Sequence, residues 1–272
     1  MLLAVDIGNT QTAVGLFSGR ELRARWALAS RSADTADEVH LKLSGLLRGE
    51  LAGGAGGAAA GGGDSGDAFT SIDAAVIASV VPPLTGSWQQ AAQRICGTRP
   101  VVVGPGVKTG LPMRYDNPAE VGADRVADAL GAIALVGAPV VVVDLGTATN
   151  IEVVDRGGAF LGGVIAPGLG TSAADLAAHA ARLPMVDLSF PGHVVGTNTN
   201  DAMRSGLMYG ELARIDGLVR RIFGELGYEA PVIATGGFAN VMAQLSQTVT
   251  HHEPDLTLQG LRIIHERNTA RR

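Results

Sequence analysis

The sequence predicts an α/β protein built from two copies of one strand-rich unit. Short apolar runs alternate with stretches of helical periodicity, which is typical of α/β folds. One turn motif occurs twice, as DIGNTQT at 6–12 after the apolar run 2–5 and as DLGTAT at 144–149 after the run 140–143. Hydrophobic residues make up 46% of the 272 residues and charged residues 17%, a composition that can bury a core.

The first half of the chain is expected to hold several strands and two helices. Residues 35–48 place apolar side chains on one helical face, and Asp34 before them is a suitable N-cap. Short apolar runs bounded by turn residues indicate the strands. We expect strands at 2–5, 12–17, 22–28, 74–80 and 101–103 and helices at 35–48 and 88–95.

A low-complexity segment interrupts this half at 52–67. Its residues are nearly all Gly, Ala, Ser and Asp, which cannot offset their own ordering entropy by burial. We therefore expect a flexible insertion without a chemical role.

The second half repeats the alternation of strands and helices. Pro118 suits the first turn of a helix, because the amide hydrogen that proline lacks would have no partner there. A hairpin is expected around the second copy of the turn motif. The expected elements are helices at 119–135, 171–181, 202–227 and 237–247 and strands at 140–143, 150–154, 159–165 and 232–234.

Charge and composition exclude several partners and compartments. The net charge is −5 and the basic residues form no extended block, so we expect no nucleic-acid partner. Cys96 is the single thiol, which favours a reducing, cytoplasmic compartment. The chain reaches Asp6 before an apolar signal region could form. The apolar run 129–143 is shorter than the ~20 residues of a membrane span, so we expect no membrane segment.

The repeated turn is the most informative feature of the sequence. Asp and Gly are common in β-hairpin turns, so one copy alone would be weak support for a ligand site. Two copies in matching contexts indicate a duplicated unit. Two facing Asp-Gly turns would place backbone amides and hydroxyl groups on either side of one cleft, which suits a polyphosphate.

Two other nucleotide-binding patterns fit less well. The chain has only Lys42 and Lys108, and neither stands in a Gly-Lys-Ser/Thr context, so a Walker A loop is excluded. GLGTSA at 168–173 matches a dinucleotide-binding pattern and would make the chain a nicotinamide-dependent oxidoreductase. It lies far from the first strand and follows Pro167, so a glycine turn that leads into a helix N-terminus is the preferred interpretation.

A polar group stands early in the helix expected at 119–135. Gly122 is unfavourable inside a helix by about 1 kcal/mol relative to alanine, and Asp124 and Arg125 follow it. One interpretation is an ion pair on a solvated face, which is common and contributes little. The other is a ligand site, where the missing Cβ lets a ligand approach, Asp124 handles a proton and Arg125 binds an anion.

Several motifs, in order along nearly the whole chain, resemble those of type III pantothenate kinases, which begin coenzyme A biosynthesis. They are DIGNT at 6–10, YDNP at 115–118, EVGADR at 120–125, DLGTAT at 144–149, GGVIAPG at 162–168, GTNT at 196–199 and ATGG at 234–237. That family belongs to the actin, sugar kinase and Hsp70 superfamily. The resemblance implies two RNase H-like domains, at 1–117 and 118–272, with ATP and pantothenate bound in the cleft between them.

The resemblance also implies roles for individual residues. The first turn would wrap the ATP phosphates with Asp6, Ile7, Gly8, Asn9, Thr10, Gln11, Thr12 and Ala13. Asp6 would hold Mg²⁺, Thr147 would add a phosphate contact, and Asp144 would bind a monovalent cation, K⁺ or NH₄⁺. Pantothenate would contact Tyr115, Gly122, Ala123, Asp124, Arg125 and Thr199. Among these, Asp124 would accept the proton of the attacking hydroxyl, Arg125 would pair with the pantothenate carboxylate, and Thr199 would act across a homodimer interface.

The implied function is ATP-dependent phosphorylation of pantothenate to 4′-phosphopantothenate. In phosphoryl transfer, positioning and charge neutralisation dominate, so an ordinary carboxylate suffices as base and no catalytic lysine is needed. A non-catalytic nucleotide-binding regulator on the same fold is the alternative, and it would bind ATP without turning over pantothenate. The presence of Asp6, Asp124 and Asp144 together favours the kinase.

Overall fold

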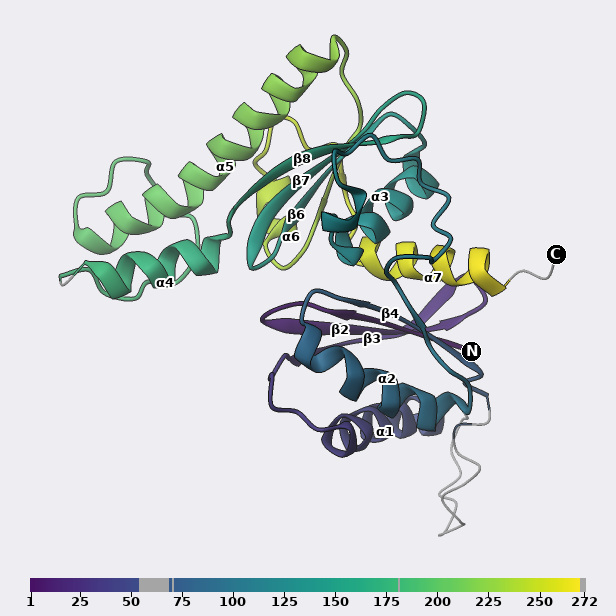
Figure 1. Ribbon diagram of the computed structural model, residues 1–272. Coiled ribbons are helices and arrows are strands. Elements are labelled where there is room, and N and C mark those ends of the chain that lie inside the picture. Colours follow the sequence, from purple (N-terminus) through teal and green to yellow (C-terminus); the bar gives the residue numbers. More distant parts are fainter. Residues whose placement is uncertain (54–68, 70, 181, 270–272) are drawn as a thin grey trace. The chain divides into compact units, whose positions relative to one another are not determined.

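A five-stranded sheet opens the computed structural model, which describes residues 1–53, 69, 71–180 and 182–269 (Figure 1). Within this sheet β1, β2 and β3 form an antiparallel meander, β4 runs parallel to β1, and β5 runs parallel to β4. The strands are β1 (Leu2–Ile7), β2 (Gln11–Ser18), β3 (Glu21–Ala29), β4 (Ala74–Ser79) and β5 (Val101–Val102), in the spatial order β3-β2-β1-β4-β5.

A second five-stranded sheet repeats this topology. It consists of β6 (Val140–Leu145), β7 (Ala148–Val154), β8 (Phe160–Pro167), β9 (Val232–Thr235) and β10 (His251–His252), ordered β10-β9-β6-β7-β8. An antiparallel meander of three strands is again followed by two parallel ones. Read from β8, the order matches the first sheet strand for strand, which confirms the predicted duplication.

Helices cover both faces of the first sheet. On one face lie α1 (Ala36–Gly53) and α2 (Pro82–Cys96), whose side chains Leu43 and Trp88 join β1 and β4 in one apolar core (Figure 1). On the other lies α7 (Leu256–Thr269), where a Cβ on Gly15 would be 3.0 Å from Leu258 Cδ1. Cys96 is buried at the end of α2, and burial raises the pKa of its thiol to about 12, so it stays protonated at neutral pH.

The second sheet packs against the long helix α5 (Thr199–Leu226). Met208, Ile215 and Val219 of α5 are fully buried against β6, β9 and the short helix α6 (Ala239–Ala243). Another helix, α4 (Leu169–His179), follows β8 directly and lies beside α5 (Figure 1).

The helix expected at 119–135 is divided in the structure. A 3₁₀ turn, η1 (Pro118–Glu120), ends at Val121, whose extended backbone (φ −75°, ψ 121°) interrupts the helix before α3 (Ala123–Val136) begins. Gly122 therefore precedes the helix, and the helical penalty expected for it does not arise. By contrast, α5 begins at Thr199 rather than 202, because the Asn198 side chain caps it by accepting a hydrogen bond from the Asp201 N–H (2.9 Å).

The chain divides into two compact units that are discontinuous in sequence. The first comprises Met1–Gly110, Asn117–Gly131 and Thr257–Arg272, and the second Leu111–Asp116 and Ala132–Leu256. This differs from the expected division into 1–117 and 118–272, because two later segments group with the first unit. They are joined to each other: Thr257 Oγ1 donates to Asp128 Oδ1 at 2.6 Å, and a Cβ on Gly260 would overlap the backbone of Ala127.

Two expectations concern segments without chemistry. The insertion expected at 52–67 begins inside α1, which extends to Gly53, and its remaining residues lie outside the described part of the chain. Within the described residues, none of the helices has the length and apolar character needed to cross a bilayer.

A buried carboxylate fixes the connection that follows α6. Asp216 of α5 accepts hydrogen bonds from Ser246 Oγ (2.6 Å), Thr248 Oγ1 (2.8 Å) and the backbone N–H groups of Gln247 (3.1 Å) and Thr248 (3.2 Å). Burial alone would raise the pKa of Asp216, but these hydrogen bonds together hold it below its usual value of 3.8. The charged form of Asp216 therefore stabilises the folded state.

We predict that Asp216→Asn lowers the free energy of unfolding by about 1.5–3 kcal/mol at neutral pH, because amide hydrogens would face several donors. The extra free energy of unfolding that Asp216 gives the wild type should be fully present above pH 3.8. It should disappear as the pH falls through the lower pKa that Asp216 has in the folded state. Urea unfolding at several pH values measures both effects. Glu225→Gln, at an exposed position of the same helix, is the control, and equal losses in the two variants would contradict the assignment.

Candidate active site

The first predicted phosphate-binding turn lies between β1 and β2. Gly8 N–H donates to the Gln11 carbonyl at 3.0 Å, and a Cβ on Gly8 would approach that oxygen to 2.9 Å, so the turn requires glycine. Asn9, Thr10 and Gln11 are exposed at its tip. The side chain of Thr12 is instead fully buried, with its Oγ1 2.8 Å from Ser30 Oγ. The predicted set 6–13 is thus contiguous, but Thr12 can offer a ligand only its backbone.

The segment 122–125 belongs to the same unit and lies near the same end of the first sheet. Val80, just after β4, donates its N–H to the Ile7 carbonyl at 3.0 Å. A Cβ on Gly122 would lie 3.5 Å from Val80 Cγ1. The end of β1 and the start of α3 therefore both adjoin Val80, as a shared site requires.

Asp124 occupies a partly buried position in the first turn of α3. Its Oδ1 accepts a hydrogen bond from the Arg125 N–H at 2.8 Å, and a Cβ on Gly122 would collide with that same oxygen. Burial raises the pKa of Asp124 above its usual value, although this hydrogen bond acts in the opposite direction. Arg125 is only 6% exposed, so the interpretation of the pair as charges on a solvated face is wrong.

The second turn joins β6 to β7 and is one residue shorter than the first. Gly146 N–H donates to the Ala148 carbonyl at 3.0 Å, as Gly8 does in the first turn. The start of α4 rests on this turn, because the Thr147 carbonyl accepts hydrogen bonds from Gly168 N–H (3.0 Å) and Thr171 Oγ1 (2.7 Å). The segment 168–173 is therefore a glycine turn leading into a helix N-terminus, and the preferred interpretation of it is confirmed.

Asp144 stands at the end of β6 in a row of polar residues. It is in direct register with Asn150 on β7 and with Thr235 on β9, so the three side chains share one face of the sheet. Gly236, after β9, has φ +90°, and a Cβ there would lie 2.5 Å from Asp144 Oδ1 and 2.7 Å from the Leu145 backbone. No role was predicted for Gly236, although the motif ATGG at the end of an apolar strand was the available signal.

A pocket of about 900 Å³ lies between α4 and α5 in the second unit. Thr199, the predicted substrate contact, lines it together with Thr171 and Asp175. The remaining lining is mostly apolar and comes from Pro167, Ser172, Leu176, Leu183, Ala202, Met203, Gly206 and Leu207. The pocket thus offers an apolar wall with a few polar groups.

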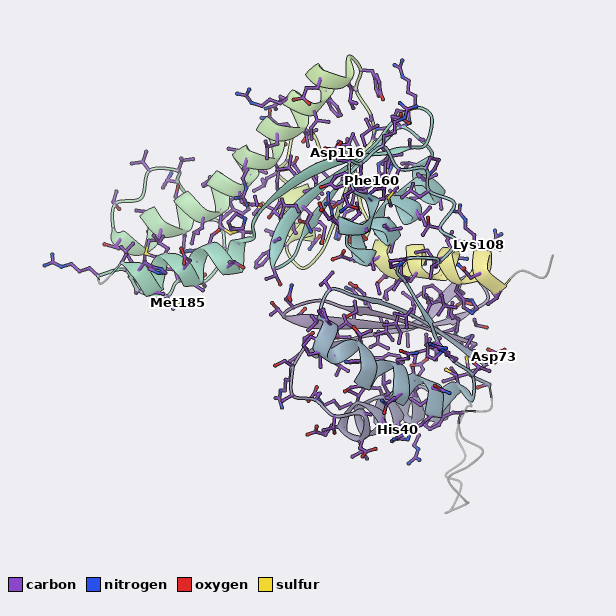
Figure 2. All side chains as sticks on the ribbon, in the orientation of Figure 1. His40, Asp73, Lys108, Asp116, Phe160 and Met185 are labelled. Carbon is purple, nitrogen blue, oxygen red and sulfur yellow. The ribbon has the colours of Figure 1, made fainter. Side chains whose placement is uncertain are left out.

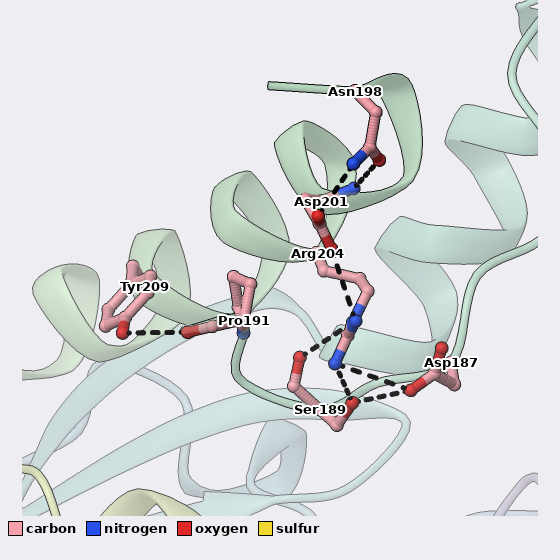
Figure 3. A network of polar contacts seen from close by, with 7 residues as sticks. All are labelled: Asp187, Ser189, Pro191, Asn198, Asp201, Arg204 and Tyr209. Atoms are coloured by element: carbon pink, nitrogen blue, oxygen red, sulfur yellow. Dashed lines mark hydrogen bonds and ion pairs between the residues drawn. The ribbon is translucent and has the colours of Figure 1, made fainter. Parts of the chain in front are cut away.

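A polar network anchors the segment that leads to Thr199 (Figure 3). Arg204 Nε donates to the Ser189 carbonyl at 3.2 Å, and its guanidinium also pairs with Asp201 (3.4 Å) and Asp187 (3.7 Å). Tyr209 Oη donates to the Pro191 carbonyl at 3.2 Å. These contacts hold residues 187–191 against the first three turns of α5 and thereby fix the segment that precedes Thr199.

The predicted substrate contacts are divided between the two units. Tyr115 lies in the second unit, where a Cβ on Gly162 would be 3.3 Å from its ring, and its centroid is 6.1 Å from that of Phe160. Thr199 is in that unit as well, whereas residues 122–125 belong to the first.

Comparison with known proteins identifies a family. A family model described as type III pantothenate kinase matches residues 2–221. The chain is 42% identical to the type III pantothenate kinase of Acidobacterium capsulatum, over 100% of this chain and 97% of that protein. It is 42% identical to that of Moorella thermoacetica over 99% of this chain and 100% of that protein. Identity to the Thermomicrobium roseum enzyme is 44%, over 98% and 97% of the two chains.

Solved structures share the fold at low sequence identity. A Campylobacter jejuni protein assigned to the Baf family of transcriptional activators superposes with a TM-score of 0.59 and 17% identity, over 99% of this chain and 100% of that one. An ethanolamine utilization protein from Carboxydothermus hydrogenoformans gives 0.53 and 12%, over 96% and 89%. These likenesses concern the fold alone. With the repeated sheet topology, they bear out the expected pair of RNase H-like, actin-like units.

We predict that Gly236→Ala destabilises the protein by about 2–4 kcal/mol, because alanine combines a disfavoured positive φ with a clash against Asp144. Gly237→Ala is the matched control, since a Cβ there meets nothing within 4 Å, and it should change stability by less than about 0.5 kcal/mol. Chemical denaturation measures both. Similar stability of the two variants would show that the close approach at Asp144 is not a constraint.

Proposed function

The chain belongs to the type III pantothenate kinase family, and we infer from this that it transfers the γ-phosphoryl group of ATP to pantothenate. It is a kinase of coenzyme A biosynthesis, and it uses ATP with a divalent metal. The observation that carries this conclusion is 42% identity to such kinases along the whole chain. The expected product is 4′-phosphopantothenate. We propose a cytoplasmic location, in keeping with a single, buried thiol at Cys96.

We propose that the two Asp-Gly turns bind the phosphates of ATP. The exposed tip of the first turn at 9–11 offers polar side chains, and Thr147 offers a hydroxyl at the second. The start of α4 lies on the second turn, and a helix N-terminus favours an anion. These groups would supply the positive potential that a Walker A lysine supplies in other nucleotide-binding proteins.

Mg²⁺ is proposed to enter the site together with ATP. Within the described residues, no group of three His, Cys, Asp or Glu side chains could hold a metal by itself. Mg²⁺ commonly binds one or two carboxylates together with substrate phosphates and waters. Asp6, at the end of β1, would supply the carboxylate, directly or through water.

Asp144 is proposed to bind a monovalent cation, K⁺ or NH₄⁺. Asn150 and Thr235 flank it on the same face of the sheet and carry side-chain oxygens, which hard cations prefer as ligands. Bound there, the cation would add positive charge beside the phosphate turn. Gly236 lacks the Cβ that would collide with Asp144 Oδ1 and so leaves room for this carboxylate.

We propose that Asp124 accepts the proton of the pantothenate hydroxyl as the phosphoryl group is transferred. Burial raises the pKa of Asp124, which makes its carboxylate a stronger base than that of an exposed aspartate. Arg125 would pair with the pantothenate carboxylate, since a buried guanidinium binds a carboxylate through two hydrogen bonds. Gly122 and Ala123 would allow close approach, and Tyr115 would complete the contacts.

A homodimer is proposed to complete the site at Thr199. Apolar side chains near the α4–α5 pocket are exposed in the single chain, including Met185 (Figure 2) and Val195, which is 81% exposed. Exposed apolar patches of this kind mark interaction surfaces. A second copy seated on this surface would cover them, and Thr199 would then serve the partner's substrate.

We predict that Asp124→Asn lowers kcat for pantothenate phosphorylation at least about 100-fold, because general-base catalysis contributes ~10²- to 10⁴-fold. The variant should fold, melt within a few degrees of wild type and still bind ATP. Initial rates and melting curves on one preparation test this. Glu21→Gln, an exposed change in the same unit, is the control.

The wild-type pH profile provides a second readout of Asp124. Its kcat should rise through an acidic limb whose midpoint lies above 3.8, because burial raises the pKa of this carboxyl and only the carboxylate accepts a proton. The limb should be missing from Asp124→Asn. Near-normal turnover of that variant, or an unchanged acidic limb, would contradict the base assignment.

We predict that replacing K⁺ by Na⁺ strongly reduces the wild-type rate, because the two ions differ in size and hydration. Asp144→Asn should lower the rate in K⁺ and weaken the dependence on the ion. Rates in matched chloride salts at constant ionic strength measure this. Equal wild-type rates in the two salts would remove the cation role from Asp144.

A further inference from the structure

A charged pair on α5, Glu211 and Arg214, joins this helix to β7, which leaves the second turn, and to the end of β8. Glu211 is 5% exposed and accepts a hydrogen bond from Oγ1 of Thr149, in β7, at 2.6 Å. Its other carboxylate oxygen pairs with the guanidinium of Arg214, one turn further along α5. Thr149 is the register partner of Leu145, which follows Asp144 in β6. Glu211 therefore contacts the strand that leaves the second turn.

Arg214 extends the connection to the neighbouring strand. Its Nη2 donates to the Pro167 carbonyl at 2.7 Å and lies 3.4 Å from Thr149 Oγ1. Pro167 is the last residue of β8, and Gly168 after it donates its N–H to the Thr147 carbonyl at 3.0 Å. The pair thus contacts β7, which leaves the turn at 144–147, and the end of β8, whose next residue binds the Thr147 carbonyl.

Apolar contacts on either side of the pair also dock α5 onto the sheet. Met208, Ile215 and Val219 of this helix are fully buried in the apolar core on either side of the pair. The Glu211 side chain is 4% exposed and that of Arg214 is 29% exposed. An ion pair withdrawn from water often contributes no more stability than apolar side chains of similar volume, because desolvation offsets the attraction. Its distinctive property is directional: a planar guanidinium and a carboxylate fix the positions of the groups that they bind.

We propose that Glu211 and Arg214 are positioning residues that hold the second turn and the start of α4 in the geometry that binds the ATP phosphates. The proposal rests on the assignment of this turn to ATP in the proposed function. Loss of the pair should move Thr147 and the α4 N-terminus and weaken ATP binding. The pantothenate contacts at 122–125 belong to the first unit, and the proposed contact Thr199 lies at the far N-terminal end of α5 from the pair. Pantothenate binding should therefore be affected little.

The test uses the double variant Glu211→Gln/Arg214→Gln, which leaves no unpaired charge in the core. Expected results are an ATP Kd and an ATP KM raised about 10- to 100-fold, the range for groups that orient a site from behind. The pantothenate KM of the double variant should stay within about twofold of the wild-type value. In the control Arg221→Gln/Glu225→Gln, which alters exposed residues of the same helix, the ATP Kd and both KM values should also stay within about twofold of wild type. Arg214→Lys keeps the positive charge and serves as a second variant if the double variant does not fold. It should also weaken ATP binding, because an ammonium lacks the planar fork.

Calorimetric titration with ATP and its non-hydrolysable analogue separates this proposal from the proposed function. Lower melting temperatures with unchanged ATP affinity in both the double variant and Arg214→Lys would assign the pair a purely structural role and overturn the proposal. A pantothenate KM that rises as much as the ATP KM would overturn it too. If the wild type bound ATP but did not phosphorylate pantothenate, the proposed function would fail, while weaker ATP binding by the variants would still support the positioning role.

Discussion

Close approach of glycine backbone to carboxylates and to backbone carbonyl groups is the constraint on which the candidate site depends. Gly236 brings the chain against Asp144, Gly122 leaves room for the Asp124 carboxylate, and Gly168 sets α4 onto Thr147. A Cβ at any of these positions would meet an oxygen or the backbone. The acidic side chains are thereby placed by strand ends and helix starts, which are rigid, and not by mobile loops. Such preorganisation suits a reaction whose catalysis consists mainly of positioning and charge neutralisation.

The two turns differ in a way that fits separate tasks. The first is one residue longer and exposes polar side chains at its tip, while the second exposes Thr147, receives hydrogen bonds from the start of α4 and lies beside the contacts of Glu211 and Arg214. The first turn thus exposes more polar side chains than the second, and the second adjoins a helix N-terminus. The two copies thus share the hairpin geometry and differ in the side chains and helices that pack beside them.

Local features could be predicted from the sequence, and long-range ones could not. The repeated motif and the apolar runs predicted both hairpins, because strand period and turn chemistry are encoded by neighbouring residues. The break at Val121 was missed because proline and the apolar spacing favour a continuous helix. α7 was also missed, although Leu258, Leu261 and Ile264 are spaced as on one helical face. The grouping of α7 with α3, the burial of Arg125 and the pairing of Glu211 with Thr149 all depend on contacts between distant segments.

The most direct test of this account is the release of ADP from ATP by the purified wild-type protein, measured with and without pantothenate in a K⁺ buffer containing Mg²⁺. The account predicts rapid ADP release only when pantothenate is present, with formation of one phosphorylated pantothenate for each ADP. ADP release at the same rate in both reactions, or ATP binding with no pantothenate-dependent release, would contradict it.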